Sequence, residues 1–160
     1  MIRNAESGDI REICSIYNYY IENTTVTFEE EPVSADEMEK RILEVAASYP
    51  WLVYEDNGRV IGYAYASKWK ARAAYKHSAE LSVYVSKDYR GKGVGKKLYE
   101  ALIDELRKTN IHVVIGGMSL PNEQSKRLHE SMGFREVAEF KEVGYKFQKW
   151  IDVGYWELIL

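Results

Sequence analysis

Apolar residues between positions 10 and 20 recur at intervals of three or four, and this spacing predicts a helix behind a short edge strand at 1–6. The polar, Thr-rich stretch 23–34 predicts a loop or a broken helix. A second helix is expected over 34–48, because its first residue is a serine, a glutamate follows three positions later as in a capping box, and a proline ends the segment.

The middle of the chain changes to strand-like spacing. Two runs, at 51–55 and 60–67, are joined by Asp56-Asn57-Gly58-Arg59, and Asn-Gly is the strongest short hairpin signal that a sequence offers. A third strand is predicted over Glu80 to Val85. These runs predict an antiparallel hairpin followed by a further strand.

The pattern then alternates between helix and strand. A valine and three leucines between 94 and 106 recur at helical spacing, and the continuous apolar run 111–118 predicts a buried strand. A short helix that begins at Asn122 or Ser125 should end at Gly133, a good C-terminal glycine.

The last strands are predicted at 135–142 and 154–160. With a hairpin first and alternating strands and helices after it, the order predicts an α+β fold, in which helices flank one mixed, mostly antiparallel sheet. No repeat, low-complexity run or linker interrupts the sequence, so residues 1–160 are predicted to form one domain.

Composition narrows the range of partners. The chain has 160 residues, of which 46% are hydrophobic and 29% charged, and its formal net charge of −3 disfavours a nucleic-acid module. The apolar run 111–118 is far too short to span a membrane, and the N-terminus has no apolar signal core. The single cysteine, Cys14, excludes a disulfide framework and a multi-cysteine metal site. It is interpreted as a small core residue, and no metal is expected.

The segment from Glu80 to Leu98 combines a strand, a glycine-rich turn and the start of a helix. Such a turn presents backbone N–H groups at the positive end of a helix dipole, which is a ready anion site. Five basic residues and one acidic residue lie between Lys87 and Lys97. A Walker loop and a dinucleotide fingerprint fit poorly, because Lys97 and Lys96 stand where they need Ser/Thr and Gly. These residues therefore predict a phosphate-bearing cofactor.

Two motifs in this order are similar to those of a known superfamily. The motif that resembles the acetyl-CoA signature of the GNAT superfamily of N-acetyltransferases is Arg90-x-x-Gly93-x-Gly95 after Val83-x-Val85. The motif that resembles its second CoA-binding segment is Asn122-x-x-Ser125-x-x-Leu128-His129-Glu130-x-x-Gly133-Phe134. The resemblance implies acetyl-CoA as the co-substrate and a GNAT-like fold whose two central strands splay apart.

Further segments, spread over nearly the whole chain, look like the phosphinothricin acetyltransferase family. They are Ile16-Tyr17-Asn18, Glu22-Asn23-Thr24-Thr25-x-Thr27-Phe28, Glu31-Pro32-Val33-Ser34, Trp69-Lys70-x-Arg72-x-Ala74-Tyr75, Leu120-Pro121-Asn122 and Gly144-Tyr145-Lys146-Phe147-x-x-Trp150-x-Asp152-Val153-Gly154. Members of that family acetylate the α-amino group of small substrates such as phosphinothricin, methionine sulfoximine and methionine sulfone. The resemblance implies this activity and a homodimer with its site near the interface.

The resemblance also implies how acetyl-CoA binds. Backbone groups of the strand would pair with the pantetheine arm and stabilise the developing oxyanion, while the glycine-rich turn would hold the pyrophosphate. The expected cofactor-binding residues are Val83, Tyr84, Val85, Arg90, Gly91, Lys92, Gly93, Val94, Gly95, Lys96, Asn122 and Ser125.

Two residues are expected to carry the chemistry. Glu80 occupies the family's proposed base position, where partial burial would raise its pKa toward the working range. The alternative is a strand-end carboxylate in solvent. His129 stands where many superfamily members have a tyrosine general acid, and histidine can donate a proton near neutral pH. A structural histidine is the alternative, and His77 and His112 are interpreted as structural or surface residues.

The segment from Trp69 to Tyr75 is expected on the substrate side. Arg72 could hold a carboxylate or phosphinate bidentately, which lysine cannot do as well, and Tyr75 and Phe28 could shape the pocket. Lys70 is interpreted as a solvated charge.

The prediction is therefore an acetyl-CoA-dependent N-acetyltransferase for a small amino acid or analogue. Acetylation of a polyamine, an aminoglycoside or a protein is one alternative, and a non-catalytic CoA-binding sensor is another. The ring-rich tail from Tyr145 to Trp156 is expected in the core, in the pocket wall or at the dimer surface. The expected compartment is the cytoplasm, given the absent signal, the single thiol and the need for acetyl-CoA.

Overall fold

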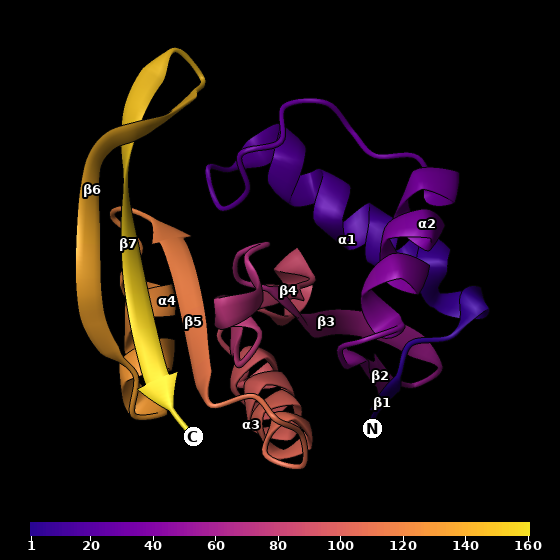
Figure 1. Cartoon of the computed structure of the whole chain (residues 1–160). Helices are drawn as coiled ribbons and strands as arrows, with labels where there is room; N and C mark the ends of the chain where they lie inside the picture. The colour runs from indigo at the N-terminus through magenta and orange to yellow at the C-terminus, as the bar shows by residue number, and fades with distance from the viewer.

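The computed structural model describes residues 1–160, and its centre is one seven-stranded sheet (Figure 1). The strand order is β1-β2-β3-β4-β5-β7-β6, and every neighbouring pair is antiparallel except β4 and β5, which run parallel. The strands are β1 (Ile2–Asn4), β2 (Trp51–Asp56), β3 (Arg59–Lys68), β4 (Ser78–Val85), β5 (Val113–Ser119), β6 (Arg135–Lys146) and β7 (Lys149–Ile159). The predicted α+β fold with a mixed, mostly antiparallel sheet is confirmed.

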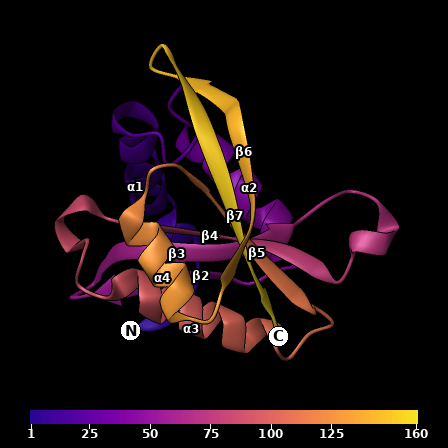
Figure 2. The same cartoon turned by 90° about the vertical axis from the view of Figure 1, so that its left-hand side faces the viewer.

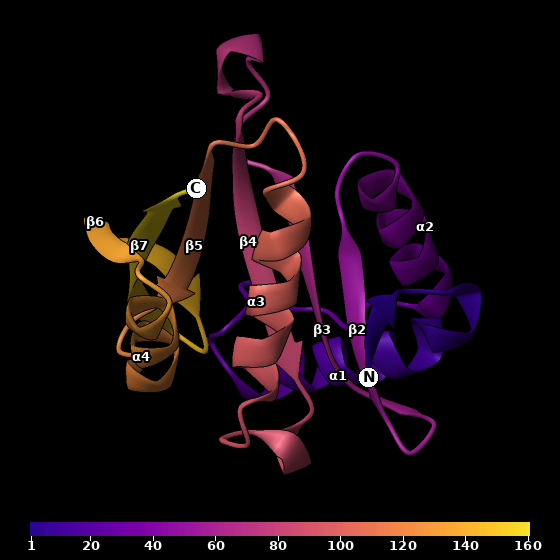
Figure 3. The ribbon, with the colours of Figure 1, turned by 90° about the horizontal axis from the view of Figure 1, so that it is seen from below.

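Four helices cover the two faces of the sheet unequally. They are α1 (Ile10–Asn23), α2 (Ala35–Ala46), α3 (Val94–Leu106) and α4 (Glu123–Ser131). The first two lie on one face over β2 and β3, and the other two lie on the opposite face (Figures 1 and 3). On the α1 side, the half of the sheet formed by β5, β7 and β6 therefore carries no helix.

The apolar stripes of the helices form the two layers of the core. Leu98, Leu102 and Leu106 of α3 are fully buried on one face, and Ile13 of α1 is fully buried on the other. Burying one such side chain stabilises a fold by about 1.5–3 kcal/mol. Cys14 lies buried in the α1 layer, as expected, and its thiol donates to the Val33 carbonyl.

The strongest local signals act as predicted. Ser34 caps α2, and its hydroxyl accepts the backbone N–H of Glu37 at 3.1 Å. Asn57 and Gly58 both have positive φ, at 49° and 75°, and join β2 to β3 in a tight hairpin.

The last hairpin is longer than the sequence predicts. Its strands end and begin on either side of Phe147 and Gln148, which take positive φ values of 51° and 60° although neither is a usual left-handed residue. A bulge around Glu142, also at positive φ, breaks the alternation in β6. The predicted strands at 135–142 and 154–160 are too short because the turn and the bulge have no glycine or asparagine to mark them.

The centre of the sheet opens between β4 and β5. Their pairing covers only Ser78 to Glu80 against Val113 to Ile115, after which both strands continue without pairing to each other. The name fork is used below for this point of separation, after Glu80 and Ile115. The expected splaying of the two central strands is confirmed.

Two connecting segments project from opposite ends of β4 (Figures 2 and 3). The segment before β4 contains a single helical turn at Ala73–Tyr75, and the segment after it contains a turn at Lys87–Tyr89 and the glycines. None of the chain's helices has both the length and the apolar character that crossing a membrane requires.

Candidate active site

Three cavities meet at the fork. The turn cavity, about 620 Å³, borders the glycine-rich turn, and the apolar cavity, about 740 Å³, lies against the helix-free half of the sheet. Between them, the fork cavity of about 240 Å³ shares Val83, Asn122 and Ser125 with the first, and Glu80 and Phe28 with the second. The three cavities thus form a route from the turn, through the sheet, to the apolar chamber.

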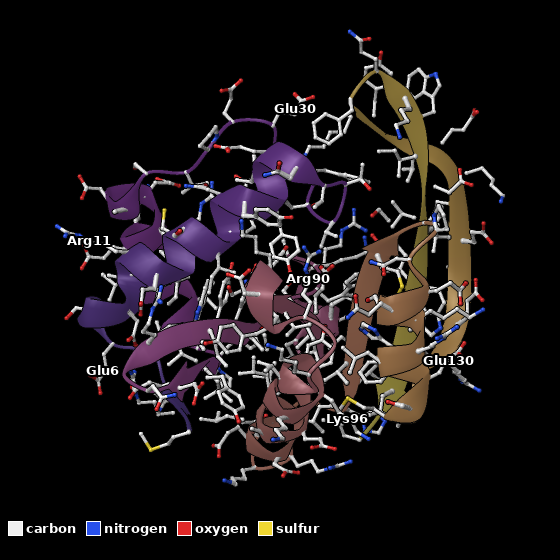
Figure 4. The ribbon with its side chains drawn as sticks, turned by 180° about the vertical axis from the view of Figure 1, so that it is seen from behind. Glu6, Arg11, Glu30, Arg90, Lys96 and Glu130 are labelled. Atoms are coloured by element: carbon white, nitrogen blue, oxygen red, sulfur yellow. The ribbon has the colours of Figure 1, made fainter.

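The turn cavity has the properties of an anion site. Gly91 and Gly93 have φ values of 74° and 79°, which favour glycine, and Gly93 begins α3 without any side-chain cap. The N–H groups of the first turn of α3 therefore face outward at the positive end of its dipole. Arg90 and Lys96, both labelled in Figure 4, line the same cavity.

Contacts with α1 hold Arg90 in place. Its guanidinium donates to the Tyr19 hydroxyl at 3.1 Å and lies 5.5 Å and 5.8 Å from the ring centres of Tyr19 and Tyr20. Lys92 lies elsewhere, with its ammonium 4.9 Å from the ring centre of Tyr89, and it lines none of the three cavities.

Most of the expected cofactor-binding residues come together here. Those that line the turn cavity are Val83, Val85, Arg90, Gly91, Gly93, Val94, Gly95, Lys96, Asn122 and Ser125. Tyr84 borders the fork cavity instead. The Asn122 side chain also starts α4, because its Oδ1 accepts the Ser125 N–H at 3.1 Å.

Glu80 lies at the fork, where it borders both the fork cavity and the apolar cavity. Burial raises the pKa of its carboxyl above the ordinary value, and the nearby charge of Lys70 partly opposes that rise. A carboxyl in this setting can accept a proton from a group in either cavity, so Glu80 is not a solvated strand-end charge.

His129 is buried, only 2% exposed, but its ring does not offer a proton to the fork cavity. Nδ1 lies 2.7 Å from the Ser125 carbonyl oxygen, which can only accept, so Nδ1 carries the hydrogen. Burial lowers the pKa of the ring, which favours the neutral form. Nε2 is then a bare acceptor, buried and without any partner. This geometry argues against the predicted role of His129 as the general acid.

Two glycines let rings stand against both faces of β5 at the fork. A Cβ on Gly116 would lie 2.3 Å from Nε2 of His129, and a Cβ on Gly117 would lie 2.8 Å from the ring of Tyr155. Any larger residue would push one of these rings away. The diglycine therefore shapes the fork, and a glycine pair inside a buried strand was the available signal for it.

The apolar cavity is enclosed mainly by rings and aliphatic side chains. The charged residues in its wall are Glu80, Glu157 and Lys70. The Lys70 ammonium lies 5.1 Å from the ring centre of Trp69, whose ring packs edge-on against Tyr155. Lys70 is exposed, as a solvated charge would be, and it is also the one cation in the wall of this chamber.

Two expected substrate residues lie outside the apolar cavity of their own chain. Arg72 and Tyr75 are exposed on the segment that projects before β4, and neither lines any of the three cavities (Figure 2). Phe28, the third expected residue, borders both the apolar and fork cavities.

The loop that carries Phe28 is fastened over the fork. Lys146 of β6 is 2% exposed and donates to the Thr27 carbonyl at 2.9 Å, and the Phe28 ring lies against Gly144. From the other side, Arg41 of α2 donates twice to Glu29, at 2.8 Å and 2.9 Å. The last hairpin and helix α2 thus both fix the loop that carries Phe28, and this loop forms one wall of the site.

Tyr99 is a site residue that the sequence did not single out. It belongs by spacing to the buried stripe of α3, yet it borders the fork cavity together with Glu80. No sequence signal separates it from the leucines around it.

Comparisons with known proteins agree with this geometry. A family model described as an acetyltransferase (GNAT) domain matches residues 2–154. The phosphinothricin N-acetyltransferase of Streptomyces viridochromogenes is 40% identical over 98% of this chain and 85% of its own length. The L-methionine sulfoximine/L-methionine sulfone acetyltransferase of Salmonella typhimurium is 38% identical over 99% of this chain and 94% of its own length.

A solved structure shows the same likeness in three dimensions. The GNAT superfamily phosphinothricin acetyltransferase of Sinorhizobium meliloti, in complex with acetyl-CoA, superposes with a TM-score of 0.97 at 34% identity. The match covers 100% of this chain and 88% of that one.

Proposed function

Because the chain belongs to the GNAT family of acetyltransferases, we propose that it acetylates the α-amino group of a small amino acid or amino-acid analogue. The activity itself, acetyl-CoA-dependent N-acetyl transfer, follows from the family. The relatives named for phosphinothricin and for methionine sulfoximine or sulfone support this substrate class. The observation that carries the proposal is the position of Glu80, which is open to both the fork cavity and the apolar cavity.

The turn cavity is the proposed site of the cofactor's polar half. Free N–H groups at Gly93 and the start of α3, with Arg90 and Lys96, suit a pyrophosphate. Beyond the fork, the edge of β4 from Leu81 to Val85 has no strand partner on the β5 side, which leaves it free to pair with the pantetheine arm. Its N–H groups can then stabilise the oxyanion that develops on the acetyl carbonyl.

Glu80 is the proposed general base. The amine arrives as an ammonium, which has no lone pair for attack, so a proton must leave first. A carboxylate whose pKa is raised by burial accepts this proton more readily than one in solvent. The nitrogen then attacks the acetyl carbon and the C–N bond forms. The nitrogen loses its second proton to solvent, and the C–S bond breaks with its electron pair going to sulfur.

Lys70 is the proposed partner of the substrate's carboxylate. It is the one cation in the apolar cavity, and it lies near enough to Glu80 for its charge to lower the pKa of that carboxyl. A carboxylate on Lys70 would therefore place the neighbouring amine toward Glu80. A polyamine would meet only two acidic groups in this chamber, Glu80 and Glu157, and one of these is the base. The cavity therefore suits a small amino acid better.

A homodimer is the proposed assembly, with a second copy on the helix-free half of the sheet. Large apolar side chains are exposed along β6, β7 and the turn between them, and such a patch marks a protein interface more often than a solvated face. They are Val137, Phe140, Val143, Tyr145, Phe147 and Trp150. Val137, Phe140 and Val143 also form the outer wall of the apolar cavity, so a partner there would close the chamber.

The same assembly gives Arg72 and Tyr75 a role. Both are exposed on a projecting segment, and the Arg72 guanidinium makes no hydrogen bond or ion pair within its chain. We place them at the apolar cavity of the partner subunit, where the arginine would add a second cation for an anionic substrate. The reaction belongs in the cytoplasm, which supplies acetyl-CoA.

A thiol-release assay with acetyl-CoA tests the function. The amines compared are methionine sulfone, methionine sulfoximine, phosphinothricin, ordinary amino acids and a polyamine, and we expect turnover with the first group and little with the polyamine. Binding of CoA without turnover of any amine would favour a sensor instead. Turnover confined to a polyamine or a peptide amine would contradict the proposed substrate class.

A further inference from the structure

The reaction needs a proton donor as well as a base. When the C–S bond breaks, its electron pair goes to sulfur, and a thiolate leaves less readily than a thiol. The groups that could supply the proton must face the fork cavity, because it lies between the proposed sites of the pantetheine arm and the amine.

Several polar side chains around this cavity already make hydrogen bonds. Thr27 bonds to the Tyr17 hydroxyl at 2.9 Å, and Ser119 bonds to Thr25 at 3.3 Å. The Asn122 oxygen caps α4. The neutral His129 ring has its one hydrogen committed to a backbone carbonyl.

Tyr84 and Tyr99 also border the cavity, and neither hydroxyl makes a hydrogen bond, but the Tyr84 ring packs against Tyr17 and Tyr63 in the α1 layer. The Tyr99 side chain is 2% exposed, and its ring packs against His129 and Phe134, with centres 5.3 Å and 6.5 Å away. Its hydroxyl makes no hydrogen bond to the protein and is not completely buried. A rigid ring therefore holds a free O–H donor at the edge of the fork cavity.

Resting on the function proposed above, we propose that Tyr99 is a catalytic residue, whose hydroxyl donates its proton to the CoA sulfur as the C–S bond breaks. The O–H bond breaks and an S–H bond forms, which leaves free CoA as a thiol and Tyr99 as a phenolate. The nitrogen loses a second proton as it becomes an amide, and solvent water relays this proton to the phenolate, while Glu80 holds the first proton taken from the ammonium.

The surroundings of Tyr99 and Glu80 allow the first to act as an acid and the second as a base. Burial, and then the charge of Glu80, raise the pKa of Tyr99 well above its ordinary value, so its hydroxyl stays protonated while Glu80 is ionised. His129 acts as a positioning residue, because its ring packs edge-on against Tyr99 and stands on Gly116.

The test compares Tyr99→Phe with Tyr63→Phe. Phenylalanine keeps the ring contacts of Tyr99 and removes only the hydroxyl. Tyr63 is an equally buried tyrosine in the other layer, outside the three cavities, and serves as the matched control. Thermal melting should show both variants folded.

Two readouts are measured. For Tyr99→Phe we expect kcat to fall about 10²-fold, the lower end of what general acid catalysis contributes, with little change in the KM of acetyl-CoA. Calorimetry should show that the Kd of CoA rises about threefold to tenfold, which is the range of one hydrogen bond. The Kd of desulfo-CoA, which has no sulfur, should not change. Tyr63→Phe should leave both readouts near wild type.

The outcomes separate this inference from the function on which it rests. A wild-type protein that binds no CoA or acetylates no amine overturns the proposed function itself. If the wild type is active and Tyr99→Phe keeps its kcat within twofold and its preference for CoA over desulfo-CoA, only the role of Tyr99 is overturned.

Discussion

The turn cavity and the apolar cavity meet at Glu80, but the chain builds them in opposite ways. The first takes its anion-binding part from one contiguous stretch, from Val83 to Lys96, and this part works through backbone N–H groups at a helix end. The second is assembled from six separated segments and works through side chains. The anion-binding part of the cofactor side is therefore a local structure, and the substrate side is a tertiary one.

This difference teaches where specificity can change. A backbone site depends on φ angles that only glycine adopts easily, at Gly91 and Gly93, and so it tolerates little variation. The apolar cavity can change its preference by exchanging one ring or one charge while the sheet behind it stays intact. We expect substrates to differ among relatives more than the cofactor does.

The largest effect on kcat is expected from a substitution of Glu80, which lies where the cofactor side and the substrate side meet. Replacing Glu80 by glutamine keeps the shape and removes the base, so kcat should fall by about 10²-fold or more. In the wild type, kcat should fall as the pH drops through the raised pKa of Glu80, because the protonated carboxyl cannot accept a proton. A pH–rate profile with several amines measures both.

For Glu80→Gln the acidic limb that belongs to this carboxyl should disappear along with the activity. A variant with near-normal kcat at every pH would show that Glu80 is not the base, and the two cavities would then lack their common chemical group. Its Kd for CoA, measured in parallel, should stay near wild type.

The same contrast explains what the sequence could predict. The glycine-rich turn and the second CoA-binding segment are contiguous, so their residues could be named in advance, and most of them line the turn cavity. Lys92 is an exception, because the Tyr89 ring draws its ammonium away. Residues that are close in the sequence are also close in space in a turn, so a site of this kind can be predicted from the sequence.

The substrate side could not be predicted in this way. Lys70 looked like a solvated charge because nothing in the sequence shows that Trp69 will pack on Tyr155, far along the chain. Tyr99 is hidden in an ordinary apolar stripe, and its access to the site depends on the separation of β4 and β5. Arg72 can bind an anionic substrate, but it lies outside the apolar cavity of its own chain.

The next largest effect should come from mixing two damaged subunits. If Arg72 acts at the partner's site, a chain with Glu80→Gln and a chain with Arg72→Ala can form a mixed dimer with one intact site. Random pairing should then restore about a quarter of wild-type activity at low substrate concentration. The measurement is the rate after joint refolding of the two variants.

Each variant refolded alone is the control, and each should stay well below that level. No recovery in the mixture, with dimers present by light scattering, would place Arg72 at its own chain's site or at none. A protein that remains monomeric would contradict the homodimer itself, and with it the occupant proposed for the helix-free half of the sheet.

A smaller effect is expected when Lys70 is replaced by methionine, which keeps much of the side chain's length and apolar stem. The KM of an amino-acid substrate should rise about tenfold, in the range of one charge-assisted hydrogen bond, while the KM of acetyl-CoA stays constant. Because the Lys70 charge lowers the pKa of Glu80, its loss should also move the acidic limb of the rate profile to higher pH.

A simple amine without a carboxylate is the matched substrate, and its KM should not change. An equal rise in KM for both substrates would mean that Lys70 only shapes the cavity.

The smallest effect is expected on the KM of acetyl-CoA, which should respond differently to substitutions of Lys96 and Lys92. Lys96 lines the turn cavity, whereas the Lys92 ammonium stacks over Tyr89 outside it. Lys96→Gln should raise the KM of acetyl-CoA about threefold at low salt and less at high salt, since an exposed charge acts through a screened field. Lys92→Gln removes the same charge four positions away and should change this KM by less than twofold. Initial rates across a salt series measure the difference, with the KM of the amine as the internal control. Equal effects of the two substitutions would mean that the turn attracts acetyl-CoA by its general positive field rather than by the geometry of its cavity.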